Sequence, residues 1–173
     1  MWIVANKYVM NGLETERLIF RQWRKSDFEA FASFFSNPKS AHFVGGVKSE
    51  EEAYRLMTSY IGHFALHGFS YLAVVEKQSD LLVGSVGLWD SDPWPEPELG
   101  YWLLPQFHGM GYGTEAGKAV KEYAEKTAKL STLVSYIDVS NEPSKKLALN
   151  LGARYDGETA LLDFGTHQVY RYW

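Results

Sequence analysis

The stretch from Glu98 to Ala116 decides the fold and reads Glu-Leu-Gly-Tyr-Trp-Leu-Leu-Pro-Gln-Phe-His-Gly-Met-Gly-Tyr-Gly-Thr-Glu-Ala. Leu99 to Leu104 is an apolar, aromatic run of strand length, which Pro105 ends because proline cannot donate to a strand ladder. Glycines follow on alternate positions: Gly109, Gly111 and Gly113. Apolar residues then recur at helical spacing: Ala116, Ala119, Val120, Tyr123 and Ala124. The pattern predicts a strand, a glycine loop and a helix in succession.

A glycine loop that opens a helix suits a phosphate-bearing ligand. Glycine lets the backbone approach the ligand closely, and the first N–H groups of the helix point outward at the positive end of its dipole. A hydroxyl at the helix start, here Thr114, can join such a cradle.

Two general nucleotide loops compete for this stretch. A P-loop needs Lys and then Ser or Thr after its last glycine, whereas Thr114 and Glu115 follow Gly113, so this type is excluded. A dinucleotide fingerprint fits residues 111–116 by letter. Its context disagrees, because residues 105–110 separate the strand from the helix and the strands upstream resemble hairpins. A nicotinamide enzyme is therefore the weaker alternative.

A family resemblance offers a third interpretation. The segment 105–113 resembles the acetyl-CoA loop of the GNAT N-acetyltransferases, with the pattern Arg/Gln-x-x-Gly-x-Gly/Ala. Registers starting at Gln106 and at His108 both fit. The Pro-x-aromatic lead-in and the helix start favour the second, which places His108 where Arg or Gln is usual. The resemblance implies that backbone N–H groups hold the pyrophosphate of acetyl-CoA.

Three more segments resemble the RimJ/RimL-like branch of that family. Residues 98–103 resemble its fourth strand, residues 15–23 its first strand, and residues 141–152 its late Asn-x-x-Ser helix. The resemblance covers roughly residues 13–173. It implies the GNAT fold, an α/β protein whose central twisted sheet is mixed, mostly antiparallel, with helices on both faces. We expect one domain, 13–173, after a leader segment, 1–12.

Periodicity and capping signals predict the other elements. Helices are expected after capping boxes at Ser26/Glu29 and Ser49/Glu52, and after the N-cap Asn141. Strands are expected at 13–23, 69–76, 81–89, 132–138, 154–162 and 167–173. The first two helices either pack on the core or, by resemblance, cover an acceptor cleft. Trp94, in the proline-rich loop 90–97, packs on its own loop or forms a wall of that cleft.

Composition excludes several classes of protein. The 173 residues suit one domain, and the net charge of −4 gives no footprint for nucleic acid. The absence of cysteine excludes a disulfide framework and suits a cytoplasmic enzyme. No apolar run approaches the roughly 18 residues of a membrane span. His63 and His67 lack the Glu of a metal-binding H-E-x-x-H, so no metal is expected.

Acetyl transfer to an amine needs a base, donors for the thioester oxygen and a proton for the leaving thiolate. Glu98 opens the key strand and is either a base acting through water or an exposed strand-edge carboxylate. Residues 101–104 are expected to splay from the neighbouring strand and expose N–H groups to the oxygen. By resemblance Ser144 lies near the cofactor sulfur and passes a proton to it; otherwise it is a helix-surface serine.

The sequence therefore predicts an acetyl-CoA-dependent N-acetyltransferase, monomer or homodimer, that acts directly on a protein N-terminus or a small-molecule amine. An α-amino group, with pKa near 8, needs less base than a lysine amine. A non-catalytic acyl-CoA-binding or sensing module on the same fold is the alternative. The expected catalytic residues are Glu98 and Ser144. The expected acetyl-CoA contacts are Trp102, Leu103, Leu104, His108, Gly109, Met110, Gly111, Tyr112, Gly113, Thr114, Asn141 and Ser144.

Overall fold

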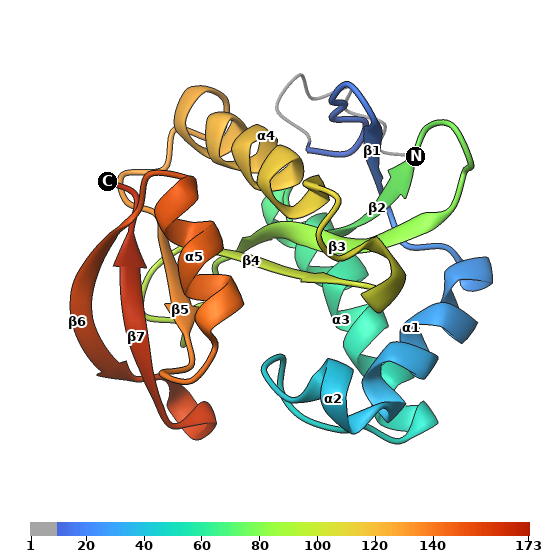
Figure 1. The fold of residues 1–173 in the computed structure, drawn as a ribbon, viewed down its shortest axis with the longest axis horizontal. Helices are drawn as coiled ribbons and strands as arrows, with labels where there is room; N and C mark the ends of the chain where they lie inside the picture. The colour runs from blue at the N-terminus through green and yellow to red at the C-terminus, as the bar shows by residue number, and fades with distance from the viewer. Residues whose placement is uncertain (1–9) are drawn as a thin grey trace.

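A computed structural model describes residues 10–173; most of the expected leader, 1–9, lies outside the described residues. One seven-stranded sheet runs through the molecule in the order β1-β2-β3-β4-β5-β7-β6 (Figure 1). The strands are β1 (Leu18–Arg21), β2 (Tyr71–Glu76), β3 (Leu82–Trp89), β4 (Glu98–Leu103), β5 (Val134–Ile137), β6 (Arg154–Ala160) and β7 (Thr166–Arg171). The helices are α1 (Phe28–Ser36), α2 (Pro38–Ala41), α3 (Glu50–His67), α4 (Tyr112–Lys126) and α5 (Glu142–Asn150).

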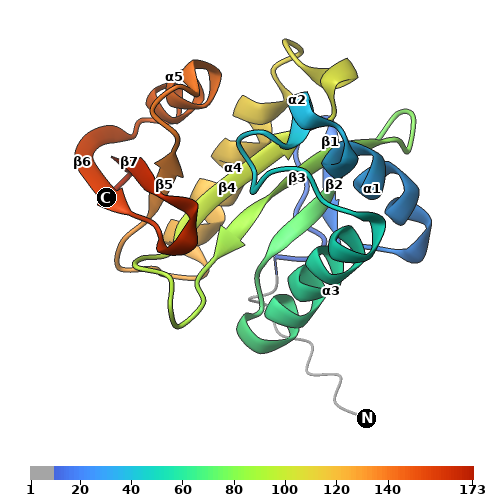
Figure 2. The ribbon, with the colours of Figure 1, turned by 90° about the horizontal axis from the view of Figure 1, so that it is seen from below.

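The helices cover both faces of this sheet (Figures 1 and 2). α1, α2 and α3 lie on one face, and α4 and α5 on the other. Side chains alternate across a strand, so β2 sends Leu72 and Val74 into the core under α4 and Ala73 into the aromatic core under α1 and α3. The structure confirms the expected mixed sheet with helices on both faces.

The sheet is antiparallel except between β4 and β5. These two parallel strands pair at a single position, Glu98 opposite Val134. Beyond it they separate, so one side of β4 from Leu99 onward faces a gap in the sheet. The expected splay at 101–104 is confirmed and begins earlier than expected.

The N-terminal strand is shorter than the sequence indicated. Glu14 forms a bridge with Ile19, and the Thr15 N–H donates to Leu18 O at 2.9 Å, so residues 14–19 fold into a turn. Within the expected leader, Met10 is fully buried and the Gly12 N–H donates to Phe20 O at 2.8 Å. The boundary at residue 13 stays a prediction.

The first expected capping box is wrong. A 3₁₀ turn, Lys25–Asp27, precedes α1, and the Asp27 carboxylate accepts the Arg24 N–H at 2.8 Å. The same carboxylate pairs with both Nη atoms of Arg21, at 2.7 and 2.8 Å. This ion pair with β1 selects Asp27 over Ser26 as the residue that organises the helix start.

The other two helix starts follow the sequence. Ser49 and Glu52 form the reciprocal capping box of α3, which ends at Gly68 with φ of 78°. Asn141 caps α5, and its Oδ1 accepts the Ser144 N–H at 3.2 Å. Both capping signals act through hydrogen bonds within the first turn of the helix, so they predict where the helix begins without reference to tertiary contacts.

Candidate active site

The glycine loop presents its backbone at the start of α4. Gly109 has φ of 74° and Gly111 has φ of 81°, a region that glycine enters without strain. Gly111 is the N-cap residue of α4 and has no side chain to cover the helix terminus. The first N–H groups of α4 are thus open to an anion.

The third glycine of the loop serves helix packing instead. A Cβ atom on Gly113 would lie 3.1 Å from Leu147 Cδ2, and one on Gly117 would lie 2.6 Å from Leu151 Cδ1. Both glycines therefore let α5 pack closely against α4, which brings Ser144 near β4.

A polar network holds the loop from behind. Arg17 donates from Nε to Glu115 Oε2 at 2.7 Å and from Nη1 to Met110 O at 3.0 Å. Its guanidinium lies 4.2 Å from the centre of the Tyr112 ring. Thr15 Oγ1 donates to the same Glu115 carboxylate at 2.6 Å. The turn before β1 is thereby tied to the loop and to the first turn of α4.

Alternate residues of β4 direct their backbone groups into the gap. The Leu104 N–H donates to Val83 O at 2.9 Å, toward β3. Residues of an antiparallel strand alternate in direction, so Tyr101 and Leu103 face away from β3. Leu99 O agrees with this, because it accepts Ser135 Oγ from β5 at 2.6 Å.

Three residues expected at the cofactor have other partners here. Leu104 uses its N–H in the sheet. Trp102 stacks on Phe34 with ring centres 4.2 Å apart, within the core under α1. His108 donates from Nε2 to Leu103 O at 2.9 Å, so its ring lies against the end of β4.

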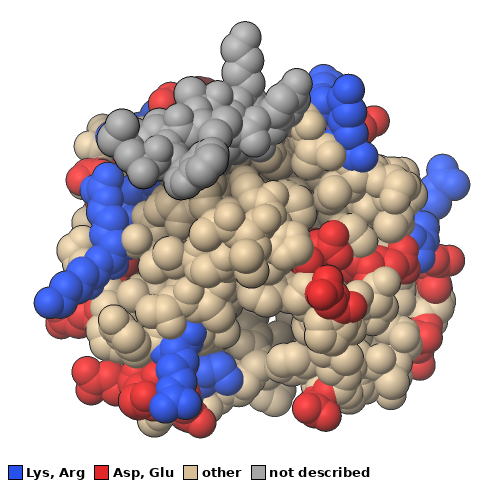
Figure 3. Space-filling view, turned by 180° about the vertical axis from the view of Figure 1, so that it is seen from behind, with Lys and Arg blue, Asp and Glu red and all other residues tan. Residues whose placement is uncertain are grey.

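A cleft of about 510 Å³ opens beside the gap between β4 and β5. Its lining includes four expected site residues, Glu98, Trp102, Asn141 and Ser144, whereas residues 108–114 do not line it. On the face behind Figure 1 the surface is mostly uncharged around a hollow in its lower part (Figure 3). The expected site is thus divided between a glycine loop and a cleft, with the gap in the sheet between them.

Glu98 lies on the floor of this cleft. Its exposure is 8%, and the Tyr71 O–H donates to its Oε2 at 3.1 Å. Burial raises the pKa of Glu98 to about 7, against the opposing effects of Tyr71, the Tyr136 N–H and Trp94. The alternative of an exposed strand-edge carboxylate is wrong. A carboxyl with this pKa can accept a proton near neutral pH.

Gly100 explains how Tyr71 reaches Glu98. A Cβ atom on Gly100 would lie 2.6 Å from the Tyr71 hydroxyl oxygen, so only glycine leaves room for the phenol across β4. No sequence pattern predicts this contact, because β3 lies between β2 and β4 in the sheet.

Ser144 and Tyr101 form a hydroxyl pair on the other face of the sheet, beside the same gap. Their hydroxyl oxygens lie 2.9 Å apart, and the Tyr101 O–H also lies 3.0 Å from Ser144 O. If Tyr101 donates to the carbonyl, the Ser144 hydroxyl donates to Tyr101. Burial raises the pKa of Tyr101 above its ordinary value, so it stays protonated. Tyr101 was expected only through its backbone, as part of the splay at 101–104; the contact of its hydroxyl with Ser144 was not expected.

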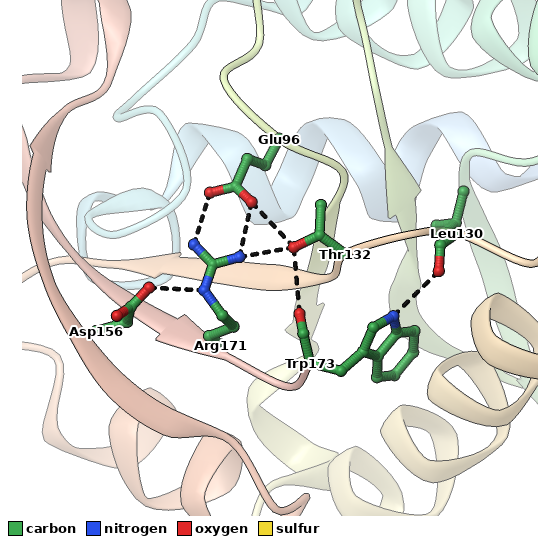
Figure 4. A network of polar contacts seen from close by, with 6 residues as sticks. All are labelled: Glu96, Leu130, Thr132, Asp156, Arg171 and Trp173. Atoms are coloured by element: carbon green, nitrogen blue, oxygen red, sulfur yellow. Dashed lines mark hydrogen bonds and ion pairs between the residues drawn. The ribbon is translucent and has the colours of Figure 1, made fainter.

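A network of polar contacts around Arg171 holds the loop that precedes β4 (Figure 4). Arg171 of β7 pairs with both Glu96 oxygens, at 2.7 and 2.8 Å, and with Asp156 Oδ2 at 2.6 Å. Thr132 Oγ1 donates to Glu96 Oε2 at 2.9 Å. The network holds the chain two residues before Glu98, and its members lie too far apart in sequence to be associated by pattern.

Two expectations concern what lies around the cleft. Trp94 packs edge-on against Tyr136 and Phe164, with ring centres 6.2 and 5.9 Å apart, and lines the cleft rather than packing only on its own loop. Met57 and Tyr60 of α3 are buried in the core and Tyr60 also lines the cleft, whereas α1 contributes no residue to that lining. That the two helices cover an acceptor site stays a prediction.

Among residues 10–173, no group of three or more His, Asp or Glu side chains is arranged to hold a metal ion. None of the helices described there is both long and apolar enough to cross a membrane.

Comparison with known proteins gives consistent matches. Residues 17–154 match the family described as the acetyltransferase (GNAT) domain. The chain is 26% identical over 148 residues to the uncharacterized N-acetyltransferase YoaA of Bacillus subtilis, covering 84% of each protein.

Solved structures share the fold. An acetyltransferase from Agrobacterium tumefaciens superposes with a TM-score of 0.85 at 30% identity, covering 93% of each chain. The ribosomal L7/L12 α-N-protein acetyltransferase RimL, solved in complex with coenzyme A, gives a TM-score of 0.73 at 17% identity, covering 91% of this chain and 94% of its own. The RimL likeness shows a common fold.

Proposed function

Because this chain belongs to the acetyltransferase (GNAT) family, we propose that it transfers the acetyl group of acetyl-CoA directly to a primary amine. The observation that carries the proposal is the gap between β4 and β5, with the Glu98 side chain on one face of the sheet and the Tyr101–Ser144 pair on the other face. Acetyl-CoA supplies the activated acetyl thioester.

The residues present fit acetyl-CoA. The open N-terminus of α4, with Gly109 and Gly111 in positive φ, offers backbone N–H groups to a pyrophosphate. The gap beside β4 offers the backbone N–H group of Leu103, the nearer of the two to the glycine loop along the strand, to an extended amide chain. RimL, which shares the fold, is described as a complex with coenzyme A.

Glu98 is the proposed base. The acceptor arrives as an ammonium ion and must lose a proton before its nitrogen can attack. A carboxylate with pKa about 7 is ionised in a large fraction of molecules at neutral pH and is basic enough to take that proton, directly or through one water. An acceptor with the pKa of an α-amino group loses its proton to this base more readily than a lysine amine does.

Other groups beside the gap support the leaving group. The Tyr101 N–H, the nearer of the two to Glu98 along β4, stabilises negative charge on the thioester oxygen in this proposal. The Ser144 hydroxyl gives a proton to the leaving thiolate and regains, through solvent, the second proton that the acceptor nitrogen loses on forming the amide. Tyr101 stays protonated and holds the Ser144 hydroxyl in place.

A thiol-release assay tests this proposal. Purified protein with acetyl-CoA and a panel of primary amines should release one coenzyme A thiol for each acetylated amine. Intact-mass measurement without acceptor should show no acetylated protein, since the transfer is direct. Acetylated protein that is competent for transfer would contradict direct transfer, and failure to bind acetyl-CoA would contradict the whole assignment.

A further inference from the structure

The acceptor side of the cleft has two aromatic walls. Tyr60, Tyr71 and Trp89 form the first, with Tyr71 and Trp89 stacked at 5.6 Å and Tyr60 edge-on to Tyr71 at 5.3 Å. The second wall contains Trp94 and Phe164, which meet edge-on. Glu98 lies between these walls.

A roof connects the walls. The loop between α2 and α3 reaches the turn before β7, where a Cβ atom on Gly45 would lie 3.7 Å from Phe164 Cε1. Phe43 of the same loop also lines the cleft. A folded protein surface cannot lie flat on the floor beneath this roof, whereas a small molecule can reach Glu98.

The charges facing the cleft are few. Besides Glu98, its lining carries Asp138, Lys48, His42 and His167, and of these five only Glu98 is buried. Asp138 Oδ1 already accepts the N–H and the hydroxyl of Ser140, at 2.8 and 2.6 Å. Lys48 Nζ donates to Gly45 O at 2.9 Å, which places a positive charge in the roof.

This distribution favours a single ammonium group. One ammonium can pair with Glu98 and lie against tyrosine and tryptophan rings, which attract cations. A second ammonium would have no free buried carboxylate among the described lining residues and would approach Lys48. Burying a charge without a partner is unfavourable.

We propose that the acceptor is a small primary monoamine with an aromatic or aliphatic body, its nitrogen at Glu98 and its body between the walls formed by Tyr71 and Phe164. This inference rests on the proposed function and names the substrate class of the same site. It distinguishes monoamines from the polyamines, aminoglycoside-like polycations and protein N-termini that the fold alone would admit.

Steady-state rates at saturating acetyl-CoA and near-neutral pH test it. The probes are 2-phenylethylamine, spermidine and a short peptide with a free N-terminus. We expect kcat/KM for 2-phenylethylamine to exceed that of either other probe by roughly 10-fold or more, the discrimination that an unpaired polar or charged group gives.

The outcomes separate the two proposals. Spermidine or the peptide reacting as well as 2-phenylethylamine would overturn the monoamine inference while confirming acetyl transfer. Binding of acetyl-CoA without acetylation of 2-phenylethylamine would also overturn it. Absence of acetyl-CoA binding, measured by calorimetry, would remove the proposed function and this inference with it.

A matched pair of variants tests the aromatic wall. Phe164 and Leu162 lie on the same turn and are similarly exposed, 55% and 49%, but only Phe164 lines the cleft. Phe164→Ala should raise KM for 2-phenylethylamine by about 5-fold, for the loss of an aromatic contact, and leave acetyl-CoA affinity unchanged. Leu162→Ala should match the parent protein. If both variants match it, the wall does not contact the acceptor and the inference is wrong.

Discussion

Replacing Glu98 by glutamine removes the titrating group from the cleft and keeps its volume. The side chain is 8% exposed, and the amide oxygen of glutamine can still accept the Tyr71 O–H that now reaches Glu98 Oε2 at 3.1 Å. Packing and one hydrogen bond are therefore preserved. Any pH-dependent difference between parent and variant reports on ionisation of this one carboxyl.

The expected effect on stability follows from the pKa. Burial moves the pKa of Glu98 from 4.5 to about 7, which corresponds to about 3 kcal/mol of folding free energy. Below pH 4.5 both folded and unfolded chains hold the proton, so ionisation has no effect. Between 4.5 and about 7 the unfolded chain ionises first, so the folded state loses stability as pH rises and carries the full penalty above 7.

Urea denaturation near pH 4.5 and near pH 8 measures this difference. Glu98→Gln should match the parent protein at the lower pH and exceed its unfolding free energy by about 3 kcal/mol at the higher. The exposed Glu125→Gln on α4 is the control and should show no such gain. Equal stability of Glu98→Gln and the parent protein at both pH values would refute the raised pKa.

Kinetics of the same variant test the catalytic assignment. The parent kcat/KM should rise with pH through about 7, because the free enzyme needs ionised Glu98. A bound ammonium lowers the pKa of the carboxyl beside it, so kcat should level off at a lower pH. Glu98→Gln should lose roughly 10²-fold or more in kcat. Unchanged turnover would show that Glu98 is not the base.

Three further substitutions probe the loop, the hydroxyl pair and the arginine network. Gly111→Val forces a branched side chain into φ of 81° and should weaken acetyl-CoA binding by at least roughly 10-fold in calorimetry, with an unchanged circular dichroism spectrum; retained affinity would contradict the cradle. Ser144→Ala should lower kcat by roughly 10²-fold with the acetyl-CoA Kd unchanged, whereas equal losses in both would make it a binding residue. Arg171→Met removes both ion-pair contacts of Glu96, which keeps only the Thr132 hydroxyl, and should reduce the unfolding free energy by about 1–3 kcal/mol in urea. The exposed pair of Lys126 supplies the control, since Lys126→Met should change it by less than about 1 kcal/mol, and equal effects would contradict a structural role for the network.

Local signals predicted most of the elements. The capping box at Ser49 and Glu52, the stop at Gly68 and the N-cap Asn141 act through hydrogen bonds within one turn of chain. The expected box at Ser26 was wrong because the Asp27 carboxylate pairs with Arg21, six residues earlier on β1, and accepts the Arg24 N–H. The capping-box pattern does not show which of two adjacent polar residues finds such partners.

The candidate site was predicted only in part, because several of its contacts join elements that lie far apart in the sequence. Gly109 and Gly111 have the positive φ that a glycine loop suggests, while Gly113 is required by Leu147, which a separate helix supplies. Glu98 was singled out by its place on the key strand. Its partner Tyr71 and the pairing of Tyr101 with Ser144 depend on which strands and helices become neighbours.

The sequence by itself determined the order of the strands and of the helices except the short α2, which was expected to be loop, together with the glycine loop before α4 and the resemblance to an acetyltransferase family. Periodicity, capping and turn residues act over a few positions. Tertiary structure alone decided how far β4 and β5 separate, which rings surround the cleft and that Glu98 is buried. The pKa of Glu98 arises from desolvation by segments that lie far apart in the chain. Only folding brings those segments together, so the chemistry of the site belongs to the assembled molecule.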